Sequence, residues 1–396
     1  MRRGAGATVM TLVLVSGCSG GGHSAGGSPP SPSPSASPTP SPTPVVREWA
    51  DVIEDVRSGV VRLDVVTCDG GGTGTGFLIS PNTVATVAHV VDGATTVRVT
   101  NPTTSVAMSG QVVTLDKDDD LAVVRLPSDM TGHVFPLSPD QPRLGTEITQ
   151  LGFQLGKAMQ VSRGEITKQH DHRYVGEDYD LSDQLLTDAV QNPGNSGGPW
   201  FTKDGTVVAL AESGPPYDAQ TDERAQGNNG GVPTSSAVAT LLPAEDPAPL
   251  APVGCDADAL PGPVELAQQT LSQYYYDIDE SDYDSAFAQL DPANHPANTL
   301  ASFRTDVGSS TDYATHGDGY YDLVKAQSTA AQVLLDVTFT SQQKAGKGPK
   351  GSPDETCTDW SLRYRFTSVN GLWLIAGTAA TPGTPGHVPC TNAEGD

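Results

Sequence analysis

Short apolar runs separated by Gly, Pro, Asn and Asp dominate the chain between about residue 60 and residue 211. The runs include VVRLDVV, TGFLIS, TTVRVT, LAVVRL and TVVALA, in which β-branched residues are frequent. Such runs predict strands, and many short strands in succession predict an antiparallel barrel or sandwich. Apolar residues at helical spacing occur just before them, in REWADVIEDVRSGV (47–60), where we expect a short helix.

A different pattern begins near residue 263. Apolar or aromatic residues recur every three or four positions, which predicts two amphipathic helices joined near Glu280. Strand-like runs follow, among them DWSLRYRFTS and LWLIAGTAA, and helices followed by strands predict an α+β domain. The acids of DIDESDYD suggest a calcium loop, but the position that an EF-hand reserves for Gly is Asp282. We therefore interpret these acids as a solvated turn between the helices.

Two Pro-rich stretches divide the chain. Residues 20–44 form a low-complexity Gly and Ser/Pro/Thr tether that cannot bury a core, and PAEDPAPLAPVG (243–254) is a second linker. The expected organisation is a signal peptide, a tether, a β-rich domain, a linker and an α+β domain, at 1–17, 18–45, 46–242, 243–262 and 263–396.

The N-terminus has the features of an export signal. Arg2 and Arg3 precede an apolar run over 9–15 that is too short to span a bilayer. The next residues, LVSGC, end at Cys18 and resemble the bacterial lipobox, which implies cleavage before Cys18 and diacylglycerol on its thiol. We expect an exported lipoprotein on the outer face of a bacterial cytoplasmic membrane. The alternative is an ordinary signal peptide with an incidental cysteine.

Four cysteines remain after Cys18, and an even number in an exported chain suggests two disulfides. Four cysteines allow three pairings, among which the sequence does not choose. We favour Cys357 with Cys390, inside one domain, which would leave Cys68 with Cys255. The spacings do not suggest a zinc site, because the chain contains no CxxC, and we expect neither a metal nor a cofactor.

The formal net charge of −25 argues against a nucleic-acid partner, which would need a basic face. An acidic surface otherwise mainly favours solubility.

The stretch TDAVQNPGNSGGPW (187–200) holds the best candidate nucleophile, Ser196. A serine hydroxyl needs a base to take its proton, usually a histidine that a buried carboxylate orients. His89 lies between two apolar runs in VATVAHVVDG, whereas His170 and His172 lie in a polar stretch that we expect to be exposed. Asp120 is the candidate carboxylate, because it directly precedes the buried run LAVVRL.

Glycines surround Ser196 in GNSGG. Backbone N–H groups of Gly194 and Ser196 can converge into an oxyanion hole, which needs a tight turn that side chains at 194, 197 and 198 would obstruct. We expect Asp118 and Asp119, just ahead of Asp120, to be solvated.

The order His89, Asp120, Ser196, within TVAHVV, DDLAVV and GNSGGP, resembles the trypsin-like serine peptidases. LLTDAVQNPGNSGGP and GGVPTSSAVATLL are similar to the high-temperature-requirement (Deg-type) branch. The resemblance covers about residues 47–242. It implies two six-stranded barrels with the site between them, His89 as base, Asp120 as its orienting group and Ser196 as nucleophile.

The resemblance also bears on specificity and control. Asn195 stands where trypsins carry the acid that pairs with a new N-terminus, so activation by N-terminal cleavage is not expected. Val190, at the usual floor of the primary pocket, argues for small or medium apolar side chains before the cut. The pocket walls are expected at Ala211, Glu212, Ser213 and Gly214. The chain lacks an obvious trimerisation arm, and we expect a monomer.

The α+β segment does not resemble the PDZ domains that Deg proteases usually carry. Residues 264–380 resemble the nuclear transport factor 2-like cone fold, a fold that serves both enzymes and binding modules. We interpret this domain as a binding or regulatory module for an unidentified partner. The leading hypothesis is a membrane-tethered serine endopeptidase acting on polypeptides. The alternative is a non-catalytic surface binding lipoprotein with a degenerate protease barrel.

Overall fold

The computed structural model describes residues 47–390 apart from 176–178, 213–216, 219–222, 225–227, 244–245, 253–259, 295–298, 309 and 315–318. Residues 47–396 form one compact unit, distinct from residues 1–46. The predicted signal peptide, Cys18 and the tether therefore lie outside the described residues. In the part of the chain that is described, no helix is long and apolar enough to cross a membrane.

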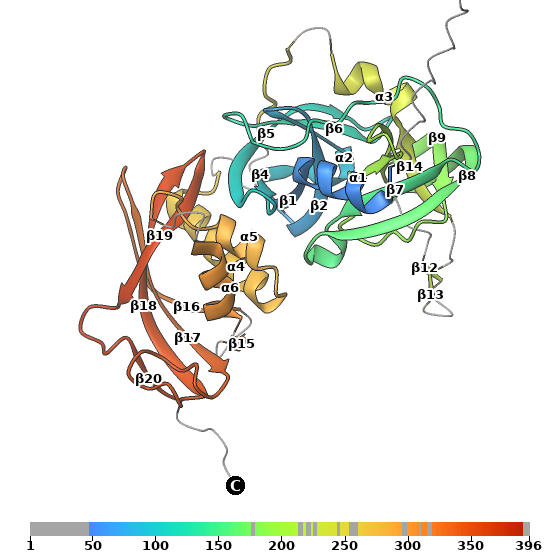
Figure 1. The fold of residues 1–396 in the computed structure, drawn as a ribbon. Helices are drawn as coiled ribbons and strands as arrows, with labels where there is room; N and C mark the ends of the chain where they lie inside the picture. The colour runs from blue at the N-terminus through green and yellow to red at the C-terminus, as the bar shows by residue number, and fades with distance from the viewer. Residues whose placement is uncertain are drawn as a thin grey trace, which may run out of the picture. The chain divides into compact units, whose positions relative to one another are not determined.

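A closed antiparallel barrel of six strands opens the described chain (Figure 1). Its strands follow one another around the barrel in the order β1-β2-β3-β6-β5-β4. Alternating apolar side chains, such as Leu63, Val99 and Val124, are fully buried and fill its interior. The strands are β1 (Val60–Thr67), β2 (Gly70–Ser80), β3 (Thr83–Thr86), β4 (Ala94–Asn101), β5 (Val106–Asp116) and β6 (Leu121–Arg125).

A second closed barrel follows, with the strand order β10-β11-β14-β9-β8-β7. Trp200 is fully buried among apolar side chains of this barrel, including Ile148 and Leu185. The strands are β7 (Glu147–Gly152), β8 (Gln160–Val175), β9 (Tyr179–Thr187), β10 (Pro199–Phe201), β11 (Val207–Ala211) and β14 (Asn229–Pro233). Strands β12 (Tyr217–Asp218) and β13 (Glu223–Arg224) form a separate two-stranded sheet. The expectation of two six-stranded barrels is thus confirmed.

Short helices join and cover the barrels. The predicted N-terminal helix is α1 (Trp49–Val56), whose buried residues Trp49, Val52 and Val56 share one face because they are three and four positions apart. That face packs on a cluster that contains Phe77 of the first barrel and Phe201 of the second. One apolar core therefore holds the two barrels together. The other helices here are η1 (Arg57–Gly59), α2 (Ala88–Val91), η2 (Gln154–Gly156) and α3 (Thr234–Leu241).

The C-terminal part has its helices first and its strands after them, as predicted. Its antiparallel sheet has the path β15-β17-β18-β19, and β16 and β20 pair with β17 and β18. Leu271 and Tyr275 of α4 are buried in one cluster with apolar side chains of the sheet such as Val337 and Phe366. The elements are α4 (Pro263–Asp279), α5 (Tyr283–Ala288), α6 (Leu300–Val307), β15 (Ser310–Ala314), β16 (Asp322–Ser328), β17 (Val333–Gln343), β18 (Cys357–Val369), β19 (Leu372–Ala380) and β20 (His387–Pro389).

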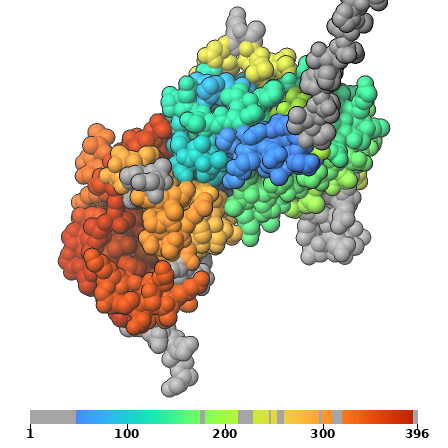
Figure 2. All heavy atoms as spheres, in the orientation of Figure 1, coloured from blue at the N-terminus to red at the C-terminus, as the bar shows by residue number. Residues whose placement is uncertain are grey.

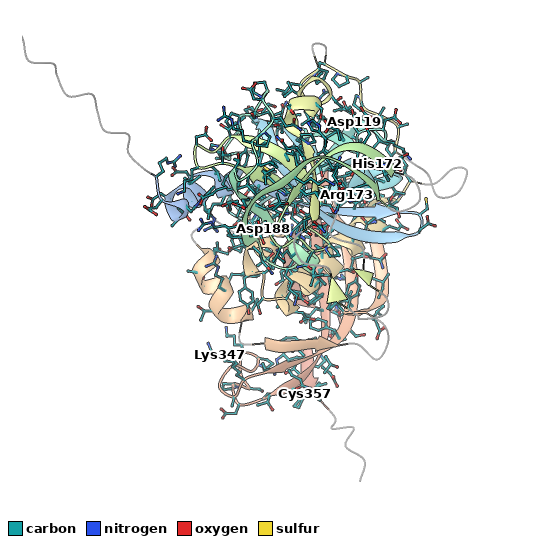
Figure 3. The ribbon with its side chains drawn as sticks, turned by 90° about the vertical axis from the view of Figure 1, so that its right-hand side faces the viewer. Asp119, His172, Arg173, Asp188, Lys347 and Cys357 are labelled. Carbon is teal, nitrogen blue, oxygen red and sulfur yellow. A yellow bond between two sulfur atoms is a disulfide. The ribbon has the colours of Figure 1, made fainter. Side chains whose placement is uncertain are left out.

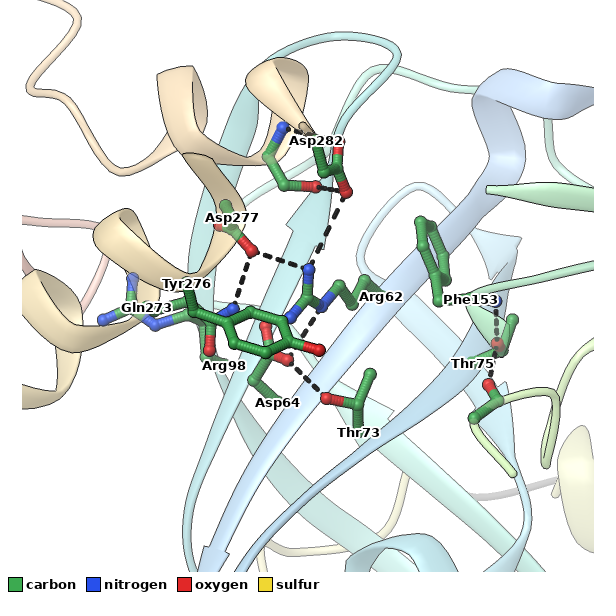
Figure 4. Close-up of polar contacts among 12 residues, drawn as sticks. Arg62, Asp64, Thr73, Thr75, Arg98, Phe153, Gln273, Tyr276, Asp277 and Asp282 are labelled. Carbon is green, nitrogen blue, oxygen red and sulfur yellow. Dashed lines mark hydrogen bonds and ion pairs between the residues drawn. The ribbon is translucent and has the colours of Figure 1, made fainter. Parts of the chain in front are cut away.

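The prediction of a solvated acidic turn between α4 and α5 is wrong for two of its acids, although Asp279 is exposed. Asp277 is fully buried and Asp282 nearly so. Both lie against Arg62 of β1, with Arg62 Nη1 2.7 Å from Asp277 Oδ1 and 3.7 Å from Asp282 Oδ2 (Figure 4). Asp282 also caps α5, because its side chain accepts a hydrogen bond from the Ser285 amide. These acids neutralise a buried arginine of the first barrel.

A disulfide joins Cys357 and Cys390, as favoured from the sequence. It connects Cys357 at the start of β18 (labelled in Figure 3) to the chain just after β20. Cys68 is also disulfide-bonded. Its predicted partner, Cys255, lies outside the described residues.

Candidate active site

His89 and Asp120 come together although they are 31 residues apart. His89 lies in α2, directly after β3, and Asp120 ends the turn that leads into β6. Nδ1 of His89 is 2.7 Å from Oδ2 of Asp120, and the backbone N–H of His89 donates to Oδ1 at 2.8 Å. Both carboxylate oxygens thus hold the same residue, which fixes the position and the tautomer of its ring.

Asp120 is fully buried and has a left-handed backbone, with φ of 50°. Asp tolerates this conformation better than most residues, which suits it to the end of the turn. Its neighbour Asp119, labelled in Figure 3, is exposed, and so is Asp118. The expectation that Asp120 alone enters the interior is confirmed.

The surroundings of His89 raise its pKa above the ordinary value. Burial acts in the opposite direction, but the hydrogen bond and the charge of Asp120 outweigh it, and the charge of Glu212 adds to them. A histidine whose protonated form is stabilised in this way can accept a proton readily once it is neutral. The ring of Tyr179 meets the His89 ring edge-on, at 6.0 Å between centroids.

The turn that carries Ser196 is fastened to strand β2 of the first barrel. The amide of Thr75 donates to the carbonyl of Ser196 at 2.8 Å, and the Thr75 hydroxyl donates to the carbonyl of Gly194 at 2.6 Å. The same hydroxyl accepts a hydrogen bond from the amide of Phe153 at 3.1 Å. One threonine therefore links the first barrel, the nucleophile turn and the segment that follows β7.

Glycine is required in this turn. Gly194 and Gly197 have φ of 93° and 83°. A Cβ atom at Gly194 would lie 2.2 Å from the carbonyl oxygen of Phe153, and one at Gly197 would lie 2.2 Å from the carbonyl oxygen of Thr75. Both backbone conformation and space exclude a side chain at these positions.

Within the part of the chain that the structure describes, the amides of Gly194 and Ser196 donate no hydrogen bond to the protein. Two donors two residues apart in a tight turn are what an oxyanion hole requires. The Ser196 hydroxyl donates to the carbonyl of Glu212 at 3.1 Å. Among the described residues, this hydroxyl forms no hydrogen bond to His89. Catalytic hydrogen bonds commonly form only in the substrate complex.

Glu212 has a place that the sequence did not predict. We expected it in a pocket wall, but its side chain is buried, with a relative exposure of 1%. Ligand-type atoms of His89, Asp120 and Glu212 lie within 4.8 Å of one another, and no other such group of three occurs among the described residues. The sequence did contain a signal for this burial. Glu212 directly follows the wholly apolar strand β11, where a charge has little access to water.

The other residues expected in the pocket for the side chain before the scissile bond differ widely in exposure. The side chain of Val190 is 60% exposed, whereas Ala211 is completely buried. Ala211 forms backbone hydrogen bonds to Gly197 and Gly198 and so supports the nucleophile turn. Ser213 and Gly214 lie outside the described residues.

Asn195, the residue before Ser196, is buried. Its side-chain amide has no hydrogen-bond partner among the described residues. His170 and His172 are exposed, as expected, and pair with Asp183 and Asp180 on strand β9. They take no part in the site.

The chain has two closed barrels, with a His–Asp pair on the first and a glycine-rich serine turn on the second. This combination is typical of trypsin-like peptidase domains. Residues 74–210 match the family model described as a trypsin-like peptidase domain. The fold expectation from the sequence is therefore confirmed.

Curated relatives include serine proteases of the Deg type. The putative serine protease HhoB of Synechocystis sp. is 36% identical over 141 residues, which are 35% of this chain and 34% of HhoB. A probable periplasmic serine endoprotease, DegP-like, of Chlamydia pneumoniae is 33% identical over 144 residues, 35% of this chain and 28% of that protein. The match thus spans about a third or less of the length of these relatives.

Among solved structures, the active form of the Rv3671c protease from M. tuberculosis is similar, with 25% sequence identity and a TM-score of 0.44. The similarity covers 55% of this chain and 97% of that one. The chain thus contains a trypsin-like peptidase domain with Deg-type homologues.

Proposed function

We propose that this protein is a serine endopeptidase that cleaves polypeptides through an acyl-enzyme. The observation that carries the proposal is the contact between partly exposed His89 and buried Asp120, 2.7 Å between Nδ1 and Oδ2. The pair lies in a trypsin-like double barrel whose glycine-rich turn presents Ser196. A buried carboxylate that orients a histidine supplies what a serine hydroxyl lacks as a nucleophile.

In this proposal each residue has a defined task. Ser196 Oγ attacks the scissile carbonyl carbon while His89 Nε2 takes the hydroxyl proton. The amides of Gly194 and Ser196 hold the oxygen that becomes negatively charged. His89 then passes its proton to the leaving amine, the acyl-enzyme forms, and water reverses the same steps to release the acid. Asp120 stabilises the positively charged ring throughout.

The proposed setting is the outer face of a bacterial cytoplasmic membrane, with the chain anchored through lipidated Cys18. The DegP-like relative is named a periplasmic protease, which is consistent with an exported enzyme. We propose that the C-terminal domain has a nuclear transport factor 2-like fold and binds a partner or regulates the protease. We also propose that the protein acts as a monomer.

We propose that the residue before the scissile bond has a small or medium apolar side chain, because Val190 occupies the position that usually forms the floor of the primary pocket. A peptide-library profile tests this part. Cleavage dominated by Arg or Lys in that position would overturn it.

The test of the activity is reaction with a fluorescent fluorophosphonate, which labels only activated serines. The purified full-length protein should be labelled and should hydrolyse peptides, and the Ser196→Ala and His89→Ala variants should do neither. Equal labelling of wild type and Ser196→Ala, or no labelling of either, would overturn the proposal and favour the non-catalytic binding protein.

A further inference from the structure

A pocket of about 790 Å³ lies beside the nucleophile turn, within the size range of ligand sites. The peptidase domain contributes residues such as Thr73, Leu155 and Gly194 to it. The C-terminal domain contributes the opposite wall, including Gln268, Tyr276 and Tyr320. Gly194 is one of the two proposed oxyanion donors, so the pocket opens directly next to the proposed reacting centre.

The position of the pocket can be assigned relative to the scissile bond. Strand β2 is fastened to the nucleophile turn at Thr75 and enters the pocket at Thr73, two residues or roughly 7 Å further along an extended strand. Val190, which we propose to face the side chain before the scissile bond, does not line the pocket. The pocket therefore extends from the oxyanion turn toward the side on which the leaving group departs.

Helix α4 is in direct contact with the segment that supports the turn. The hydroxyl of Tyr276 donates to the carbonyl of Leu155 at 3.2 Å, and Glu280 forms an ion pair with Lys157 at 3.1 Å. The amide of Leu155 in turn donates to the carbonyl of Pro193 at 2.6 Å. A continuous series of contacts thus runs from the C-terminal domain to the residue before Gly194.

Buried polar contacts hold this wall in place (Figure 4). Arg62 of β1, 1% exposed, binds Asp277 of α4, and the guanidinium of Arg98 on β4 donates to Gln289 and Thr270. The space-filling view shows α4–α6, in orange, against the first barrel (Figure 2). These buried contacts hold the wall residues in one position. A rigid wall of this kind can select between ligands by their shape.

We propose that the C-terminal domain forms the leaving-group side of the substrate cleft. Its occupant would be the substrate polypeptide over the residues that follow the scissile bond. The half-buried rings of Tyr276 and Tyr320 offer flat apolar surface with a polar edge, which suits an aromatic or aliphatic side chain. Glutamine side chains such as Gln268 can pair with the backbone of an extended peptide. This inference rests on the proposed endopeptidase activity.

The experiment compares two substrates with the same acyl side. One carries an aminomethylcoumarin leaving group and has no residues beyond the scissile bond. The other is a quenched fluorescent peptide with four residues beyond it, including a Phe or Leu. Tyr320→Ala should lower kcat/KM for the extended peptide on the order of tenfold or more and leave the coumarin substrate within about twofold, as expected for loss of a side-chain contact.

Tyr283→Ala is the matched control, since Tyr283 is a half-buried tyrosine of the same domain outside the pocket. It should change neither substrate. Tyr276→Phe keeps the ring that would contact the substrate but removes the hydrogen bond to Leu155. It therefore separates a contact between Tyr276 and the substrate from support of the turn through Leu155. If Tyr320→Ala does not fold, Gln268→Ala tests the same wall.

Two results would overturn the inference: equal losses on both substrates, or no loss on the extended peptide with either wall variant. Failure of the proposed function has a different signature. In that case the wild type would cleave neither substrate and would not react with the fluorophosphonate, and both proposals would be abandoned.

Discussion

Arg62 of strand β1 and Asp277 of helix α4 are 215 residues apart in the chain and form a buried ion pair, 2.7 Å between Nη1 and Oδ1. Asp64 contacts the same guanidinium at 2.8 Å, and Asp282 lies 3.7 Å from it. The peptidase domain and the C-terminal domain therefore share one buried cluster of charges. Protonation of its acids and substitution of its arginine should both change the free energy of unfolding.

The first prediction concerns stability against pH. Burial, which outweighs the attraction of Arg62, raises the pKa of Asp277 to about 7 from the ordinary 3.8. Between these values the folded protein holds a proton that the unfolded chain has lost, so the free energy of unfolding should fall as pH rises from about 4 to about 7. Denaturant unfolding at a series of pH values should show this decline.

Asp277→Asn should flatten that pH dependence, because the group no longer titrates. Asp284→Asn is the control, since Asp284 pairs with Arg304 at the surface and does not contact Arg62. A decline in Asp277→Asn as steep as in the wild type would contradict the assignment.

The second prediction concerns the cation of the cluster. Arg62→Met leaves buried carboxylates without their partner and should lower the free energy of unfolding by about 3–5 kcal/mol. The double variant Arg62→Met/Asp277→Leu removes one of the uncompensated acids and should recover part of that loss. Denaturant unfolding of Asp277→Leu completes the cycle, and a double-variant loss equal to the sum of the two single-variant losses would show that the pair is not coupled.

The third prediction concerns the pH profile of catalysis. The negative charge of Glu212 contributes to the raised pKa of His89, and the proposed reaction needs neutral His89 as the base. Glu212→Gln should lower that pKa, so the acidic limb of kcat/KM against pH should move to lower pH. The coumarin substrate provides the measurement.

Glu165→Gln, a change of the same kind at an exposed position of β8, should leave the limb in place. An unchanged or alkaline-shifted limb in Glu212→Gln would exclude an electrostatic role for Glu212.

The fourth prediction concerns Thr75. Thr75→Val keeps the shape of the side chain but leaves the carbonyl of Gly194 and the amide of Phe153 without their buried partner. We expect a loss of about 1–3 kcal/mol in stability and slower labelling by the fluorophosphonate, because the oxyanion turn loses its support. Thr75→Ser retains the hydroxyl and should label at close to the wild-type rate. Labelling of Thr75→Val at the wild-type rate would show that this hydroxyl does not position the turn.

Local sequence determined a large part of this fold. Short apolar runs separated by Gly, Pro, Asn and Asp predicted the strands. The helical spacing of Trp49, Val52 and Val56 predicted α1. The run of glycines around Ser196 predicted a tight turn, although the carbonyls of Phe153 and Thr75 that leave no room for a side chain there come from distant segments. The order of the motifs suggested His89 and Asp120 as partners.

The sequence did not reveal which charges are buried. Asp277 and Asp282 were interpreted as solvated because acids between two helices usually are, and nothing near them in the chain shows the arginine that they neutralise. The sequence also did not reveal that Glu212 is buried close to His89.

Only the tertiary structure decided these points, because burial and charge pairing depend on residues distant in the chain. Sequence by itself determined which segments become strands and helices and which residue types could carry acyl-transfer chemistry. The packing of α4 against the first barrel determined that Arg62 meets Asp277 and that Tyr276 and Tyr320 line a pocket with Gly194. Local patterns encode which face of an element is apolar, but they do not encode which other element covers it.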